Sequence, residues 1–578
     1  MNKIFPSLLC CLIISNLCVA QQVDWRWARH STDESFSQAT AITTSKSGDV
    51  YFAGKYINNF TFGPANFTVP QSGEFFLTKV LSSGFIQWGV TDQNTPGGGP
   101  TATAMATDDT NNVFVSGIFM GFIDDLGNGV TLEANGVGNQ AFCAIKYNSL
   151  GTPIWAKCAT SRNLGGINTS TGAGVAVDMA GNSYFTGTFV DDILFDSVEL
   201  TDNSIYYNEQ FFLVKYNAAG KAMWATTARN GMDNYSVATG LASFGNNLYV
   251  AGYFNGDSMG LGTNGIVYAP NAKSYSFFIA RYDLDSNLLW VRNAIGDSTV
   301  IENGITTDGN GNIYATGYFT GDSVQFGSQT LYRPNQSTPD TSFFVIKYDS
   351  AGNVLWAQTA LTSGHSVGYS IAADAAGYAY VTGGFTSDSI RFNNTLLTVP
   401  TLPNRHIFIV TYDSNGQITC ATSFGDGGSA NLGNSYVAGQ TCIAVSSIGD
   451  AYVGGTYDDS SFVIGPDSLT VTGTSDVFVA RFNCGAETGI KTVIENAGLV
   501  IYPNPADDIA TVKYTLPGDV KSASLIIYDI AGREQGRYLI NNSFGAIGIK
   551  AGNLSAGVYM CSVVEEGHVL VTREMVVK

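Results

Sequence analysis

The stretch Ser183-Tyr184-Phe185-Thr186-Gly187-Thr188-Phe189 contains a phrase that recurs along this chain of 578 residues. The phrase is an aromatic residue, two residues, glycine, one residue and a second aromatic residue. Its seven copies are Tyr51-Gly54-Tyr56, Phe114-Gly117-Phe119, Tyr184-Gly187-Phe189, Tyr249-Gly252-Phe254, Tyr314-Gly317-Phe319, Tyr380-Gly383-Phe385 and Tyr452-Gly455-Tyr457. The first aromatics of consecutive copies lie 63 to 72 residues apart. A regular long period of this kind predicts a repeat fold whose units bury their faces against their neighbours.

Each repeat contains four short segments with the pattern of β-strands. In the third repeat they lie at residues 174–178, 183–189, 211–216 and 222–225, separated by turns of Asn, Asp, Ala and Gly. Such turns favour hairpins between neighbouring strands. We expect the phrase glycine to permit a bulge or close backbone approach, and the aromatic residues to fill the space between repeats. A Lys or Arg recurs in the third segment, where we expect a solvated or locally paired charge.

The fourth segment carries Trp88, Trp155, Trp224, Trp290 and Trp356, with Cys420 in the sixth repeat. The seventh repeat ends without a fourth segment, but Trp27-Ala28 near the N-terminus matches Trp155-Ala156. We therefore predict an all-β fold, a seven-bladed β-propeller in which the N-terminal strand completes the last blade. The pattern resembles the secreted bacterial β-propeller repeat family over about residues 22–485, a likeness that implies a fold and no activity.

Composition and charge narrow the function. The net charge of −19 argues against nucleic acid, because a phosphate-binding surface needs clustered Lys and Arg. Residues 1–20 have the pattern of a secretory signal peptide, with Lys3, an apolar core and small residues before Gln21. No other segment has the pattern of a transmembrane span. We expect export through the periplasm.

Six cysteines follow the signal, and their spacing matches no metal-binding pattern. Cys143 and Cys158 are nearly symmetric about the turn between the third and fourth segments of the second repeat. A hairpin would place them on adjacent strands, so we predict a disulfide between them, with two free buried thiols as the alternative. Pairings among Cys420, Cys442 and Cys484 are less constrained.

The connections of each repeat differ in length, and the long ones fall on one face of the predicted ring. Binding residues usually lie on such loops. Candidates of suitable chemistry for a glycan or protein ligand are Arg162, Arg229, Asp233, Tyr235, Arg292, His365, Tyr369 and Tyr436.

Enzyme signatures are weak. Asp349 to Trp356 resembles the Asp box of sialidases but has different spacing, and the four histidines are too scattered for a metal cage or a catalytic triad. Asp283 to Asn287 and Asp308 to Asn312 alternate oxygen ligands as calcium loops do, yet we interpret both as side-chain-capped turns. We expect no cofactor, no metal and no catalytic residue. The alternative is a propeller enzyme, a polysaccharide lyase or glycosidase, with acids from the long loops.

A different module follows residues 486–498, which we interpret as a linker after a propeller at 21–485. Residues 499–578 resemble the type A C-terminal sorting domain of the type IX secretion system of Bacteroidota, a small β-sandwich. The features that carry the likeness are Tyr502, Pro503, Asn504 and Pro505, the 528–532 segment, Gly557 and Tyr559, and the terminal Lys578. The resemblance implies recognition by the type IX translocon and delivery to the cell surface or the medium. We therefore expect an exported, non-enzymatic binding or adhesion scaffold.

Overall fold

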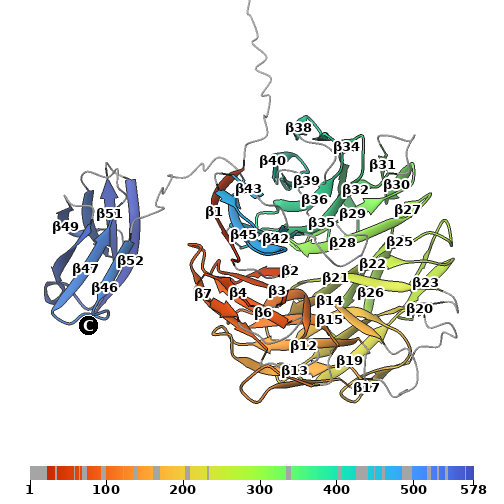
Figure 1. Cartoon of the computed structure of the whole chain (residues 1–578), viewed down its shortest axis with the longest axis horizontal. Helices are drawn as coiled ribbons and strands as arrows, with labels where there is room; N and C mark the ends of the chain where they lie inside the picture. Colours follow the sequence, from red (N-terminus) through yellow and green to blue (C-terminus); the bar gives the residue numbers. More distant parts are fainter. Residues whose placement is uncertain are drawn as a thin grey trace, which may run out of the picture. The chain divides into compact units, whose positions relative to one another are not determined.

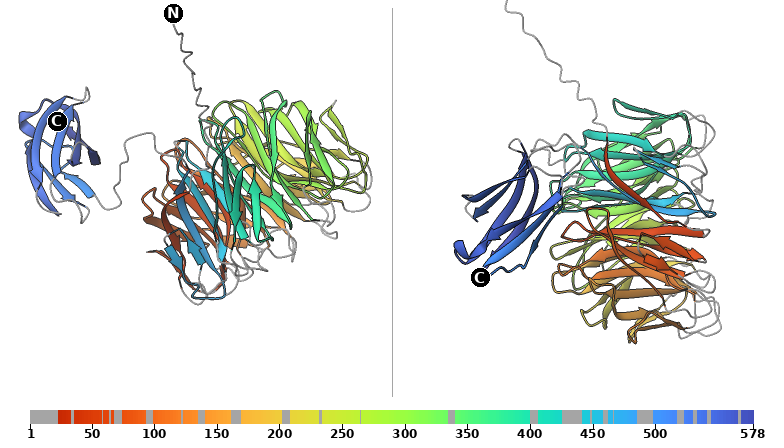
Figure 2. Two further views of the ribbon diagram at one scale, coloured as in Figure 1. Left: turned by 90° about the horizontal axis from the view of Figure 1, so that it is seen from above. Right: turned by 60° about the vertical axis from the view of Figure 1, so that its left-hand side comes forward.

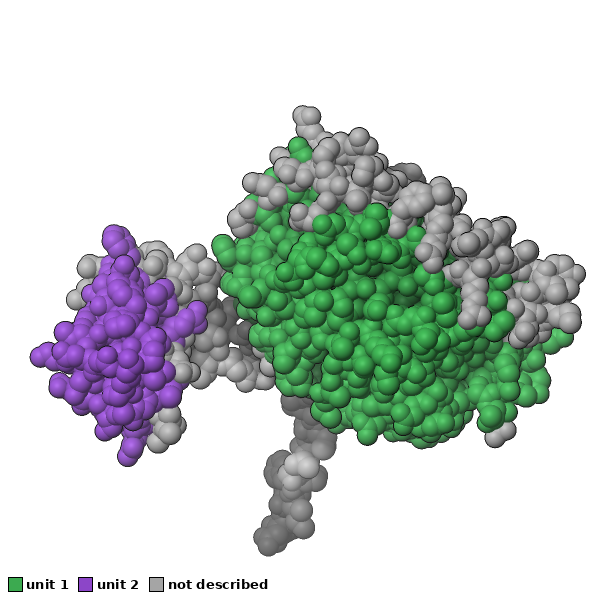
Figure 3. All heavy atoms as spheres, turned by 90° about the horizontal axis from the view of Figure 1, so that it is seen from below, with its two compact units in different colours: residues 1–485 green, residues 486–578 purple. Residues whose placement is uncertain are grey.

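The computed structural model describes residues 23–578 except 33–35, 58, 64, 68–73, 93–98, 121–122, 135–139, 161–168, 202–207, 231–233, 264, 334–339, 400–405, 425–440, 448, 458–461, 466, 485–497, 517–522, 530–532, 541–543 and 566–567. The described residues form strands, one 3-10 turn, η1 (Ala551–Asn553), and no α-helix. The all-β class expected from the sequence is therefore confirmed. The chain divides into two compact units, Met1–Gly485 and Ala486–Lys578 (Figure 3).

The described part of the first unit contains seven four-stranded antiparallel sheets. Six are built from consecutive strands. They are β2 (Phe36–Thr44), β3 (Val50–Ile57), β6 (Glu74–Val80), β7 (Ile86–Thr91); β8 (Thr101–Thr107), β9 (Val113–Phe119), β12 (Ala141–Tyr147), β13 (Pro153–Cys158); β14 (Ser170–Val177), β15 (Ser183–Phe189), β18 (Gln210–Tyr216), β19 (Ala222–Thr227); β21 (Ser236–Phe244), β22 (Asn247–Phe254), β25 (Ser276–Asp283), β26 (Leu288–Asn293); β28 (Val300–Thr307), β29 (Ile313–Phe319), β32 (Ser342–Tyr348), β33 (Val354–Thr359); and β35 (Ser366–Ala373), β36 (Ala379–Phe385), β39 (His406–Tyr412), β40 (Ile418–Phe424).

The seventh sheet joins the two ends of the first unit. It contains β41 (Cys442–Val445), β42 (Ala451–Tyr457), β45 (Asp476–Asn483) and, as its fourth strand, β1 (Asp24–His30). β1 pairs antiparallel with β45, with Ala28 opposite Ala480. The predicted pairing of the N-terminal Trp strand with the last repeat is therefore confirmed.

The first strands of successive sheets contact one another in sequence order. β2 contacts β8, β8 contacts β14, and the series continues through β21, β28, β35 and β41, which contacts β2 again. Figures 1 and 2 show the sheets following one another, with the last (blue) beside the first (orange-red). The series of contacts between first strands therefore returns to the strand at which it began.

Each long connection between second and third strands contains a small hairpin. The seven hairpins are β4 (Phe60–Phe62) with β5 (Ala65–Phe67), β10 (Ile123–Asp125) with β11 (Thr131–Glu133), β16 (Ile193–Phe195) with β17 (Val198–Leu200), β23 (Ser258–Leu261) with β24 (Gly265–Tyr268), β30 (Ser323–Phe326) with β31 (Gln329–Tyr332), β37 (Ser389–Phe392) with β38 (Thr395–Thr398), and β43 (Phe462–Ile464) with β44 (Asp467–Leu469). Every hairpin contacts the fourth strand of its own sheet. Apolar residues such as Phe195 and Leu200 are buried there, so alternation of apolar and polar residues explains these elements.

The phrase glycine lies opposite a bulge in the first strand. In the third sheet the register shifts between Gly172 and Gly174, directly beside Gly187. A Cβ atom on Gly187 would overlap the carbonyl oxygen of Thr171. The same overlap with a first-strand carbonyl recurs at Gly54, Gly252 and Gly317. The expected role of the phrase glycine is therefore confirmed, since only a residue without Cβ fits there.

Tryptophans and cations fasten each sheet to the next. Each fourth-strand Trp indole donates to a backbone carbonyl in the turn between the third and fourth strands of the following sheet. The pairs are Trp27–Ser82, Trp88–Ser149, Trp155–Ala218, Trp224–Leu284, Trp290–Ser350 and Trp356–Ser414, at 3.0 to 3.3 Å. We call this contact the turn clasp. It satisfies the buried indole N–H while the ring fills the space between sheets.

The third-strand cation lies directly opposite the Trp and often donates to the same carbonyl. Lys215, Arg281, Lys347 and Arg481 donate to the carbonyls of Leu284, Ser350, Ser414 and Ser82. Lys79 instead pairs with Asp49 of its own sheet at 3.2 Å. The expectation of a solvated or locally paired charge is confirmed for Lys79, and Lys347 and Arg481 likewise pair with Asp308 and Asp450 of their own sheets. What the expectation did not include is the second bond that bridges to the next sheet.

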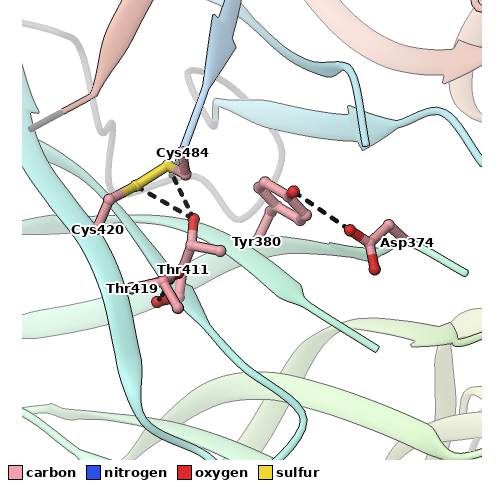
Figure 4. Close-up of a disulfide and its surroundings, with 6 residues drawn as sticks. All are labelled: Asp374, Tyr380, Thr411, Thr419, Cys420 and Cys484. Atoms are coloured by element: carbon pink, nitrogen blue, oxygen red, sulfur yellow. Dashed lines mark hydrogen bonds between the residues drawn. A yellow bond between two sulfur atoms is a disulfide. The ribbon is translucent and has the colours of Figure 1, made fainter. Parts of the chain in front are cut away.

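A disulfide replaces the turn clasp between the sixth and seventh sheets. Cys420 occupies the Trp position opposite Thr411, which occupies the cation position. Cys420 is bonded to Cys484, which follows β45 at the place of the acceptor residue in the other turns (Figure 4). The Thr411 hydroxyl donates to Cys484 Sγ at 3.2 Å. A covalent bond thus joins the two sheets where the indole is missing.

The expected disulfide between Cys143 and Cys158 is not formed. The two residues lie opposite each other on β12 and β13, as the hairpin predicts, but both thiols are free. Cys143 is fully buried in an apolar cluster, and its Sγ packs against the phrase glycine Gly117. Its sulfur therefore behaves as a small apolar side chain.

The second unit has two sheets around one apolar core. One contains β46 (Gly498–Tyr502), β47 (Ile509–Thr515) and β50 (Phe544–Lys550). The other contains β48 (Ala523–Asp529), β49 (Glu534–Ile540), β51 (Gly557–Glu565) and β52 (His568–Val577). Val512 and Ile549 of the first sheet share a buried cluster with Leu525 and Val563 of the second.

Deleting residues 21–30 removes β1 and leaves β45 as an unpaired sheet edge. We expect a melting temperature several degrees lower and aggregation, measured by differential scanning fluorimetry and light scattering. Deleting residues 541–543, which belong to the second unit, is the control for a deletion that does not affect the first unit. Unchanged melting after loss of β1 would contradict the closure argument.

The Cys420–Cys484 disulfide joins two residues that are 64 positions apart in the sequence, and removing it frees that loop. Constraining a loop of this length in the unfolded chain contributes about 2–4 kcal/mol. We expect Cys420→Ala/Cys484→Ala to melt at a lower temperature and dithiothreitol to shift only the wild type. Non-reducing peptide mapping of exported protein should recover this pair linked and shows whether Cys143 and Cys158 stay free.

Candidate functional site

A polar cavity lies where the first strands meet. Its volume is about 360 Å³, and residues of all seven first strands or their immediate neighbours line it. Six of these strands have a bulge facing the cavity wall, at Thr40, Thr103, Ala173, Thr239, Asn303 and Tyr369. The described lining residues carry hydroxyl, amide and apolar side chains, and none of them is charged.

The bulge side chains are held by bonds to the sheets. Thr103 Oγ1 donates to the carbonyl of Ser116 at 3.0 Å, and Asn303 Nδ2 donates to the carbonyl of Gly368 in the next sheet at 2.8 Å. The hydroxyls of Thr441 and Thr382 are 2.7 Å apart. Side chains fixed in this way form a rigid wall, which suits recognition of a polar ligand and offers no nucleophile paired with a base.

One acid lies buried beside this wall. Glu302 on β28 is fully buried and accepts a hydrogen bond from Thr239 Oγ1, while its Oε1 has no hydrogen-bond partner in the described structure. Burial raises the pKa of Glu302 to about 8, against a smaller lowering by the Thr239 hydroxyl. The carboxyl is therefore protonated over most of the neutral range.

The sequence contained a signal for Glu302 that our reasoning missed. Glu302 lies opposite the phrase glycine Gly317, where the other first strands place Ala39, Ala102, Gly172, Ala238 and Gly368. Aligning the first strands of the repeats shows one acid among small residues. An unpaired acid at a buried position costs stability, so it marks a place worth testing.

Five of the eight predicted loop residues lie in the described part of the chain, and the structure places them in different surroundings. Tyr369 is buried and lines the cavity. Arg229 is exposed on the short strand β20 (Arg229–Asn230), and Tyr235 is half-buried, with its backbone N–H bonded to Asn255. Arg162, Asp233 and Tyr436 lie outside the described residues.

Arg292 lies on the outer edge of the fourth sheet. Its guanidinium stacks over Trp290 at 5.3 Å and donates to the carbonyls of Val291 and Ala351. It lines a second cavity of about 550 Å³ beside β26, away from the first strands. Arg29 covers Trp27 in the same way, which identifies a repeated packing role.

His365 forms a local loop contact. Its Nε2 lies 3.1 Å from the carboxylate of Asp340, and its Nδ1 accepts a hydrogen bond from the backbone N–H of Thr341. Because the backbone N–H occupies the Nδ1 lone pair, His365 in this arrangement cannot act as a base toward the Thr341 hydroxyl.

The two calcium-like segments are capped turns, as predicted. Asp283 Oδ1 accepts from the backbone N–H groups of Asp285 and Asn287, and Asp308 does the same for Asn310 and Asn312. The described residues contain no group of three or more potential metal ligands. The carboxylates are occupied by their own turns.

In the second unit the Pro-Asn-Pro segment is tied to the last strand. Asn504 Oδ1 accepts from the backbone N–H of Val576 at 2.8 Å, and the Lys578 N–H donates to the carbonyl of Ala506 at 3.0 Å. Tyr502, Pro503 and Pro505 are exposed beside this contact. The first and last motifs predicted from the sequence therefore meet in space.

The Gly557 to Tyr559 motif begins β51 in the other sheet. Gly557 is exposed, and the half-buried hydroxyl of Tyr559 donates to the carbonyl of Ser555 at 2.8 Å. The Lys578 ammonium lies 3.6 Å from Asp507. No helix in the described part of the chain is long and apolar enough to cross a bilayer.

Residues 500–578 match the family described as the secretion system C-terminal sorting domain. This domain marks proteins secreted through the type IX system to the cell surface or extracellular space, which confirms the expected destination. The match also implies interaction with the type IX secretion system.

The chain also has more distant likenesses. An uncharacterized WD repeat-containing protein of Acanthamoeba polyphaga mimivirus is 23% identical over 378 residues, 55% of this chain and 26% of that protein. The aligned region thus spans about a quarter of the viral protein's length. A protein of unknown function from Dyadobacter fermentans has 9% identity and a TM-score of 0.35, covering 80% of this chain and 99% of its own. PorZ, a type IX surface component of Porphyromonas gingivalis, has 11% identity and a TM-score of 0.17, covering 95% and 99%.

Replacing Glu302 should change how stability depends on pH. The folded chain holds a proton up to about pH 8 that the unfolded chain releases above about 4.5. Folding stability therefore falls as pH rises through this window, by at most about 1.4 kcal/mol per pH unit, and is unaffected by this group below it.

We expect Glu302→Gln to melt like the wild type at pH 4.5 and at a higher temperature at pH 8. Glu199→Gln, which makes the same substitution at an exposed position of a hairpin, is the matched control. Equal pH profiles for the wild type and Glu302→Gln would contradict the buried, protonated carboxyl.

Proposed function

We propose that this protein is an extracellular binding protein of a type IX-secreting bacterium of the Bacteroidota, most of it a seven-bladed β-propeller closed by its N-terminal strand. The propeller would occupy residues 21–485 after removal of a signal peptide, 1–20. A linker, 486–498, would lead to the sorting domain, 499–578. The ligand would be an extracellular glycan or protein, held at the cavity formed by the first strands.

One observation carries the proposal. The first strands contact one another in a closed order around a single polar cavity with a rigid, uncharged lining. Radial closure makes a stiff scaffold, and a cavity bounded by many strands is the usual ligand position in such scaffolds. The sorting domain supplies the destination at which such a ligand would be met.

The alternative is a propeller enzyme that acts on polysaccharides. A glycosidase needs two carboxyl groups about 5 to 10 Å apart, one of them an accessible acid. None of the described residues that line the cavity is a carboxylate, and Glu302 beside it is buried and bonded to Thr239. The geometry therefore favours binding over hydrolysis.

Binding is tested with the mature full-length chain on a glycan array and on extracellular matrix proteins. We expect Ala173→Arg, which places a long cation at the cavity wall, to weaken binding at least tenfold without changing the melting temperature. Met179→Arg, on an exposed turn of the same repeat, is the matched control. Absence of any bound glycan or protein, or release of new sugar ends from a bound glycan, would contradict the proposal.

A further inference from the structure

The outward side of the β46–β47–β50 sheet is unusually apolar for an exposed surface. Its residues Val500, Tyr502, Ile509 and Phe544 are 59%, 42%, 53% and 75% exposed, respectively. Alternate residues of the same strands, such as Val512 and Ile549, are buried in the core. The core of the sandwich is therefore made by the alternate residues, and the exposed apolar residues are not part of it.

Strand register gathers these residues on one flat face. Val500 lies opposite Lys513, Tyr502 opposite Thr511, and Ile509 opposite Lys550. Between them, Lys513 and Thr511 face Ala546 and Gly548 of β50. Ala546 and Gly548 carry little or no side chain beside Lys513 and Thr511, so another protein can lie closely against this part of the face.

The charge on this face has one sign. Lys513 and Lys550 are exposed, and Lys513 Nζ lies 5.1 Å from the Tyr502 ring centre. Among the outward residues described on the three strands there is no carboxylate. This is unusual in a chain with a net charge of −19.

The other sheet of the unit differs in its charges. Arg537 pairs with Glu534 at 2.7 Å, and Arg533 pairs with Asp529 at 2.8 Å. Its exposed Leu539 and Met560 therefore lie on a sheet that also carries paired charges of both signs. A mixed surface of this kind is typical of a solvated face.

We infer that the outward face of β46, β47 and β50 is the surface by which the sorting domain docks on the type IX secretion machinery. The partner surface would be apolar with carboxylates positioned to meet Lys513 and Lys550. This inference rests on the export role of residues 499–578. Buried apolar contact would supply most of the affinity, and the two lysines would fix orientation and exclude basic partners.

The test uses the full chain in a bacterium with a working type IX system. We expect Lys513→Glu/Lys550→Glu and, separately, Phe544→Ser to lower the amount of chain at the surface and in the medium at least tenfold, with accumulation in the periplasm. Leu539→Ser is the matched control, because Leu539 is 76% exposed on the other sheet and Phe544 is 75% exposed. Melting of each purified variant checks that the substitutions leave the fold intact.

Deletion of residues 499–578 distinguishes a failure of the export role from a failure of the docking face. If the truncated chain is still exported, the export role itself is wrong and the docking inference fails with it. If the truncation blocks export but the lysine and Phe544 variants are exported normally, only the docking face is wrong. An equal defect in Leu539→Ser, or a wild-type dimer that the lysine variant dissociates without loss of export, would also overturn the inference.

Discussion

The architecture depends on how each sheet is fastened to the next. A four-stranded sheet has two faces and two edges, and none of these sheets can bury both faces alone. The turn clasp solves part of this problem, because the indole fills the gap between sheets while its N–H binds a carbonyl that no strand partner uses. A cation on the adjacent strand binds the same carbonyl in four of the junctions. Apolar packing and hydrogen bonding therefore act at one place.

The junctions nearest the two ends of the first unit involve residues far apart in the sequence. The N-terminal strand enters the last sheet, and Trp27 forms the turn clasp with the first. The neighbouring junction, between the sixth and seventh sheets, is covalent through Cys420 and Cys484. Cys484 is the last described residue before the segment that leads to the second unit. The bond thus holds the end of the scaffold at the point where the chain leaves it.

The two units differ in kind: the first is a large assembly of sheets, and the second contains the sorting domain. The first has an uncharged cavity where its first strands meet. The second is a small sandwich whose first and last motifs are tied together through Asn504, Ala506 and Lys578. The exposed apolar face of that sandwich is not needed for its own core.

The sequence by itself determined the repeat, the strand segments and the partner of the N-terminal strand. These follow from local patterns: alternation sets which face of a strand is buried, the phrase glycine marks the bulge, and Trp27-Ala28 matches the fourth segment of other repeats. The sorting domain could also be predicted from the sequence, because its motifs are short and contiguous.

Tertiary structure alone decided the contacts between repeats. The Cys420–Cys484 bond depends on the turn of one sheet facing the Trp position of the previous one, and no local pattern encodes that distance. The surroundings of the described loop candidates follow from the same kind of contact, since Tyr369 lines the cavity whereas Arg292 stacks on Trp290. Burial raises the pKa of Glu302, and the residues next to it in the sequence do not specify that burial. These contacts depend on packing between residues far apart in the sequence, which a pattern of short period cannot specify.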